Sequence, residues 1–71
     1  MKATEGTHTN IPAGFFEVGE KMTMKFKGKS CLIKDAEGNT VGAYTTEAVC
    51  DVEAGQICYV LYCDTITFTK C

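Results

Sequence analysis

The sequence contains no arginine and no tryptophan, and it has only one proline and one histidine. All of its positive charge therefore comes from lysine, which lacks the planar guanidinium that proteins use for bidentate recognition of phosphate. The formal net charge is -2, whereas nucleic-acid-binding domains carry a clear basic excess. We therefore expect no nucleic-acid partner.

The only histidine, His8, lies in a polar N-terminal stretch far along the chain from every cysteine. A nucleophilic cysteine needs a base held beside it, and the sequence has no second histidine to supply one. A chain of 71 residues also leaves little room for a ligand pocket of ordinary size. We expect no enzyme activity, no catalytic residue and no cofactor.

Long apolar runs are also missing, since none approaches the roughly 20 residues of a membrane-spanning helix. Residues 1–10 are polar throughout and lack the apolar segment of a signal peptide. We expect an extracellular or periplasmic protein in its mature form, after removal of a signal, and a cytosolic location is the alternative. Membrane contact is expected only through a lipid anchor on such a removed leader.

Cysteine is abundant by contrast, with five in the chain, of which four lie in the last 22 positions. A domain of this size buries only about 60% of the surface that its unfolded chain exposes, so its core alone is marginal. One disulfide that closes about 15 residues adds roughly 3 kcal/mol. The cysteines therefore predict a disulfide-stapled domain that lives in an oxidising compartment.

Three segments have clear strand patterns. Residues 21–29 alternate between apolar positions on one face and lysines on the other. Residues 31–34 and 40–44 flank Asp35-Ala36-Glu37-Gly38-Asn39, which predicts a hairpin in which Gly38 adopts a positive φ. No segment has helical periodicity over a useful length.

The C-terminal segment predicts a second hairpin, in which Asp64-Thr65 is a two-residue loop between residues 58–63 and 66–69. In that register Cys58 faces Cys71, which predicts a disulfide between them. A second bridge is expected from Cys31 to Cys50, leaving Cys63 as a free thiol on the core face. Five cysteines with two bridges allow 15 arrangements, so other pairings stay open.

Together these patterns predict an all-β fold, a small antiparallel β-sandwich or barrel of five to six strands that is stapled by disulfides. We expect a flexible N-terminal arm over residues 1–13 and a single β domain over residues 14–71. The residues expected in the core are Met22, Met24, Phe26, Ile33, Leu61, Ile66 and Phe68.

The predicted function is that of a small binding module, such as an inhibitor, an effector, a toxin-like protein or an exclusion protein. It would act by contact between its loops or sheet edge and another protein. The candidate interface residues are Lys21, Lys25, Lys27, Lys29, Tyr44 and Tyr62.

The alternative function is a cytosolic zinc-stabilised accessory domain that uses the four C-terminal cysteines. Their spacing, C-x7-C-x4-C-x7-C, lacks the C-x2-C pairs with which zinc ribbons and knuckles hold the ion. Cys58 and Cys63 are also five positions apart in one predicted strand, so they would point to opposite faces. We therefore expect no metal site.

Overall fold

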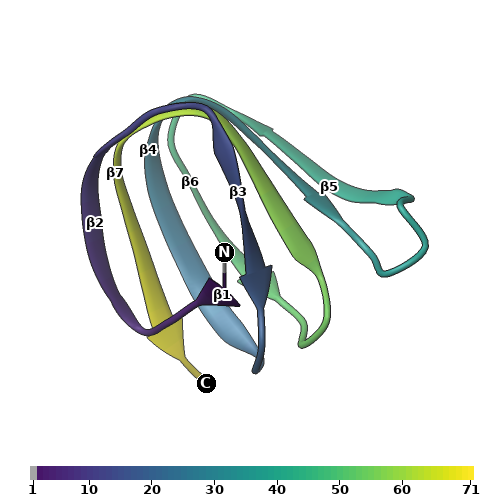
Figure 1. Cartoon of the computed structure of the whole chain (residues 1–71). Coiled ribbons are helices and arrows are strands. Elements are labelled where there is room, and N and C mark those ends of the chain that lie inside the picture. The colour runs from purple at the N-terminus through teal and green to yellow at the C-terminus, as the bar shows by residue number, and fades with distance from the viewer. Residues whose placement is uncertain (1) are drawn as a thin grey trace.

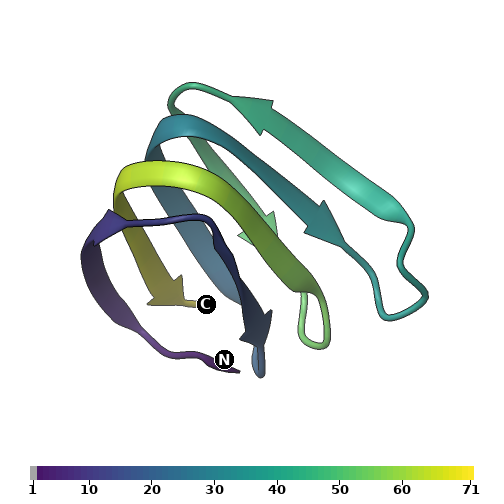
Figure 2. The same ribbon diagram turned by 45° about the horizontal axis from the view of Figure 1, so that its top comes forward.

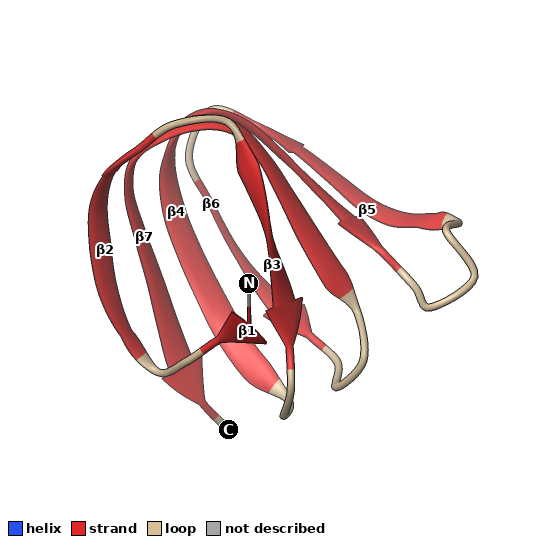
Figure 3. Ribbon diagram, viewed as in Figure 1, coloured by secondary structure: helices blue, strands red, loops and turns tan. Residues whose placement is uncertain are grey.

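In the computed structural model, which describes residues 2–71, every regular element is a β-strand (Figures 1 and 3). The strands are β1 (Lys2–Ala3), β2 (Gly6–Ile11), β3 (Gly14–Val18), β4 (Met22–Lys34), β5 (Thr40–Thr45), β6 (Ala48–Val52) and β7 (Ile57–Lys70). The all-β prediction is confirmed. Instead of a sandwich or barrel of five to six strands, the seven strands form a single sheet that is not closed. The described residues include no helix that is long and apolar enough to span a membrane.

Two long antiparallel strands, β4 and β7, run through the centre of this sheet and pair along nearly their whole length. Strands β2 and β3 pair with successive halves of β7, while β6 and β5 pair with successive halves of β4. Strand β1 joins the edge of β3 in parallel. Both central strands bend, so the sheet curls around its core (Figure 2).

The bend is produced by three register shifts between β4 and β7, at Lys27/Gly28, Gly28/Ser30 and Ser30/Cys31. At each shift one strand contributes an extra residue, as in a β-bulge, which bends the strand and redirects the following side chains. The extra residues are Asp64 and Leu61 in β7 and Lys29 in β4. The alternation of inward and outward side chains along each strand therefore changes phase at these positions.

This change of phase decides which predicted core residues are buried. Met22, Met24, Phe26, Ile33, Ile66 and Phe68 are at most 5% exposed and form the core with other apolar side chains. The prediction was wrong for Leu61, which is 64% exposed. Strict alternation from Cys63 would place Leu61 inward. Leu61 is instead an extra residue at a bulge, where the alternation is interrupted and its side chain points outward.

The predicted terminal hairpin was also wrong, because β7 continues as one strand through Asp64 and Thr65. The turn-like Asp64 is a bulge residue, so the register that placed Cys58 opposite Cys71 does not exist. All five cysteines are free thiols in the structure, and neither the Cys58–Cys71 bridge nor the Cys31–Cys50 bridge is present. Cys63, expected as a free thiol on the core face, is fully buried.

The predicted flexible arm is replaced by strands over much of its described length. Strand β2 pairs with the C-terminal half of β7, with Thr7 opposite Thr67 and Thr9 opposite Thr65. Its inward side carries His8, whose ring packs against Phe16 and Phe68. This pairing partner lies more than fifty residues away along the chain, so local polarity gave no sign of it.

The hairpin between β4 and β5 is confirmed. Gly38 has a φ of 86°, and the Asp35 amide donates to the Asn39 carbonyl at 3.0 Å. The Asp35 carboxylate accepts hydrogen bonds from the amides of Glu37 and Asn39, each at 2.9 Å. These hydrogen bonds, and above all the one from the Asn39 amide, lower the pKa of the Asp35 carboxyl.

Candidate functional site

The six candidate interface residues do not form one surface. Lys25 and Lys27 lie on the outer face of β4, whereas Lys21 is in an exposed ion pair with Glu53 at 3.4 Å. Tyr44 is directed inward, and its ring meets that of Phe26 edge-on with 6.4 Å between the centroids. Tyr44 is therefore partly buried and packs against the core.

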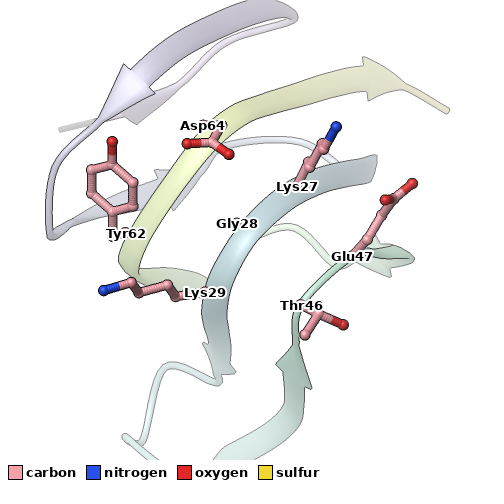
Figure 4. Close-up of a pocket in the computed structure, with 7 residues that line it drawn as sticks. All are labelled: Lys27, Gly28, Lys29, Thr46, Glu47, Tyr62 and Asp64. Carbon is pink, nitrogen blue, oxygen red and sulfur yellow. The ribbon is translucent and has the colours of Figure 1, made fainter.

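Three of the candidates line a depression of about 340 Å³ at the bend of the sheet (Figure 4). Its lining residues are Lys27, Gly28, Lys29, Thr46, Glu47, Tyr62 and Asp64. Figure 4 shows the two lysines pointing in different directions from β4, with a carboxylate on either side of that strand. Because the charges are mixed and diverge, this depression does not present a convergent site for one ligand.

Strand β5 forms an open edge of the sheet. Within residues 2–71 it pairs with β4 alone, and the β4–β5 hairpin extends beyond the rest of the sheet (Figures 1 and 2). None of its six residues, Thr40–Thr45, is charged, and Val41 is 53% exposed. Edge strands are usually protected by lysine, proline or a covering element, so β5 is a poorly protected edge.

The register of β5 fixes which of its backbone groups face outward. The Thr46 amide donates to the Lys29 carbonyl at 3.0 Å, and the same register continues through Tyr44 opposite Cys31. In an antiparallel ladder, residues alternate between bonding the neighbouring strand and pointing away from it. The N–H and C=O groups of Ala43 and Thr45 therefore point to the open edge. We call these groups together the β5 edge.

An apolar row on the outer face of the sheet leads to this edge. Phe15 pairs with Tyr59, Tyr59 with Leu32, and Leu32 with Ala43, so the row crosses β3, β7, β4 and β5. Phe15 is 48% exposed and Tyr59 is 38% exposed. Their ring centroids lie 6.0 Å apart, and the Lys34 ammonium lies 5.0 Å from the Tyr59 centroid. We call these four residues the outer apolar row.

The outer apolar row could not be predicted from the sequence. Phe15, Leu32 and Tyr59 each stand next to a buried apolar residue, so both faces of their strands look apolar. Alternation then gives no indication of which residue points outward. Residues 40–45 carry no charge, but only the pairing of β5 with β4 alone identifies that strand as an edge.

Four cysteines lie inside the sheet and one lies outside it. Burial raises the pKa of Cys50 to about 11 and that of Cys63 to about 11. Cys71 is exposed, and its Sγ lies 3.4 Å from the Thr23 hydroxyl. The part of the chain that the structure describes has no group of three or more His, Cys, Asp or Glu side chains placed to hold a metal. The zinc alternative thus has no assembled ligand set in this structure.

In comparisons with protein-family models, with curated proteins and with solved structures, nothing matches this chain. The candidate site is accordingly defined by its geometry alone.

Proposed function

We propose that this protein is a small non-enzymatic binding module, secreted or exposed on a cell envelope, that adds an extended segment of another protein to the β5 edge. The observation that carries this proposal is the uncharged open strand β5, whose outward backbone groups at Ala43 and Thr45 lack a partner strand within residues 2–71. An inhibitor, an effector, a toxin-like protein or an exclusion protein could each use such an edge to contact its target.

Strand addition supplies affinity and specificity from different groups. Main-chain hydrogen bonds to an edge strand contribute about 0.5–1.5 kcal/mol each, whatever the sequence of the added segment. Alternate side chains of that segment would lie on the outer face, where one of them would sit beside Ala43 and extend the outer apolar row by one strand. A partner segment with aromatic or branched apolar residues at every second position suits this surface.

Secretion and disulfide stapling belong to the same proposal and rest on the cysteine content. Fractionation of the source cells, with an antibody against the chain, tests the compartment. We expect the protein in the medium or the periplasmic fraction. Recovery from the cytosol alone would contradict this part of the proposal.

The binding mode is tested by selecting peptides from a phage-displayed library of linear nonapeptides on the immobilised full chain. Selected peptides should bind the wild type and lose most of their affinity for Ala43→Pro, which removes one amide that faces the open edge without removing a bond to β4. Ala43→Thr is the matched control, because it changes the side chain at the same position and keeps the amide. Selection of no peptide, or equal binding to Ala43→Pro, would contradict the proposal.

A further inference from the structure

Two fully buried thiols touch each other inside the sheet. The Sγ atoms of Cys31 and Cys58 lie 3.1 Å apart, and both residues are 0% exposed. A disulfide bond is about 2.05 Å long, so the two sulfurs need to approach by only about 1 Å. We propose that Cys31 and Cys58 are the cysteines that form the disulfide of this protein in an oxidising compartment.

The backbone already holds this pair together. Cys31 on β4 is opposite Val60, and Cys58 on β7 is opposite Ile33, so the two cysteines are diagonal neighbours on adjacent strands. Diagonal neighbours are commonly about 7–8 Å apart, and here both side chains point into the core and bring their sulfurs into contact. The bridge would therefore join the two central strands of the sheet.

The other three cysteines are placed differently. Cys50 lies on β6 opposite Met24, Cys63 lies at the bend opposite Gly28, and Cys71 is exposed after the end of β7. The nearest sulfur contact of the pair is with Met24, whose Sδ lies 3.3 Å from the Cys58 Sγ. A thioether does not form a disulfide, so Met24 packs against the bridge without competing for it.

The oxidant is a small disulfide such as oxidised glutathione. One of the two cysteines, as its thiolate, attacks one sulfur of oxidised glutathione, forming a mixed disulfide and releasing one glutathione thiolate. The thiol of the other cysteine then loses its proton to water, and its thiolate attacks the protein sulfur of the mixed disulfide and releases the second glutathione as a thiolate. The protein loses two protons and two electrons, and the oxidant becomes two molecules of reduced glutathione.

The contact between Cys31 and Cys58 perturbs both thiols in the folded sheet. The contact between the two sulfurs lowers the pKa of Cys31 and, together with burial, raises that of Cys58. Because neither sulfur is accessible in the folded sheet, exchange occurs while the chain is unfolded or locally open. The closed core then protects the bond from reduction.

The bridge would close a loop of 27 residues that contains β5 and β6. The bridge would lower the conformational entropy of the unfolded chain and so stabilise the folded one. We expect Tm to rise by more than about 10 °C on oxidation. Three thiols would remain, at Cys50, Cys63 and Cys71.

The test refolds the full chain in a buffer of reduced and oxidised glutathione and maps the disulfides of the product by mass spectrometry. We expect a loss of two hydrogen atoms, a single linked peptide pair that contains Cys31 and Cys58, and a higher Tm than that of the reduced protein. Cys50→Ser and Cys63→Ser should still form the bridge. A bridge between any other pair, or a chain that remains fully reduced, would overturn the inference.

This inference rests on the oxidising compartment in the proposed function and does not depend on the β5 edge. The two are separated by measuring peptide binding on the reduced and the oxidised protein. Peptide binding without a bridge would overturn only the disulfide, whereas a mapped Cys31–Cys58 bridge without peptide binding would overturn only the binding mode.

Discussion

A β-carbon placed on Gly28 would lie 2.3 Å from the Cα atom of Cys63, closer than such atoms approach in real proteins. It would also lie 2.7 Å from the Tyr62 carbonyl oxygen. The backbones of β4 and β7 thus come together at the bend, and the space between them has no room for a side chain. This contact lets a single sheet curl around one core.

We predict that Gly28→Ala destabilises the fold by about 3 kcal/mol, because either strand must shift at a point where backbone meets backbone. Urea unfolding followed by circular dichroism measures the effect. Gly14→Ala is the control, since a β-carbon there meets nothing closer than an oxygen at 3.9 Å and should change stability little. Equal stability of Gly28→Ala and wild type would contradict the description of the bend.

Asp35 should make the β4–β5 hairpin sensitive to acid. Its pKa is lowered in the folded chain, so its stabilising effect is present above the unfolded pKa of about 3.9 and is lost as the pH falls through the folded pKa. Asp35→Asn should therefore lower Tm at neutral pH and have little effect at the acidic end of the titration. The control Glu37→Gln, which alters a neighbouring carboxylate, should keep the wild-type pH dependence. Parallel pH profiles for wild type and Asp35→Asn would contradict this prediction.

His8 contributes a polar atom to an apolar environment. Its ring centroid lies 5.8 Å from that of Phe16 and 6.4 Å from that of Phe68, and its Nε2 is buried without a hydrogen-bond partner among the described residues. Replacing a buried unpaired polar group by an apolar one of similar shape removes a desolvation cost. We predict that His8→Phe stabilises the protein by about 1 kcal/mol in urea unfolding, whereas His8→Asn gives no gain. A less stable His8→Phe would show that the imidazole makes an interaction absent from this packing.

The thiols should differ sharply in reactivity in the folded, reduced protein. Cys71 is exposed, whereas Cys50 and Cys63 are buried with pKa values raised to about 11, so few of their thiolates form at about pH 8. Timed alkylation with iodoacetamide and intact-mass analysis should show one fast adduct, followed by slow ones as the fold opens. Cys71→Ser should remove the fast adduct. Several equally fast adducts in the wild type would contradict the burial of these cysteines.

Local patterns in the sequence predicted local structure well. The alternation of Met22, Met24 and Phe26 located the core face of β4, and Gly38 located the turn of the β4–β5 hairpin. Both features depend on neighbours within a few residues along the chain. The bend was not predictable in this way, because Asp64-Thr65 has the composition of a turn and the bulges that accommodate Asp64 depend on the partner strand.

Long-range pairing explains the other differences. The residues of β2 are polar and looked flexible, yet they pair with β7 at the opposite end of the chain. The Cys58–Cys71 pair was predicted from a hairpin register that β7 does not adopt, and the structure instead brings Cys31 into contact with Cys58. The outer apolar row likewise exists only after four strands are aligned in register.

The central claim, that β5 accepts a partner strand, is tested most directly by amide hydrogen exchange of the full chain, followed by NMR with and without a selected peptide. In the free protein the Ala43 and Thr45 amides should exchange fast, while the Tyr44 amide between them is protected by β4. Saturating peptide should slow exchange of the Ala43 and Thr45 amides by a factor of about ten or more, because both amides would then donate to the added strand. Unchanged exchange at these two amides in the presence of bound peptide would contradict the account.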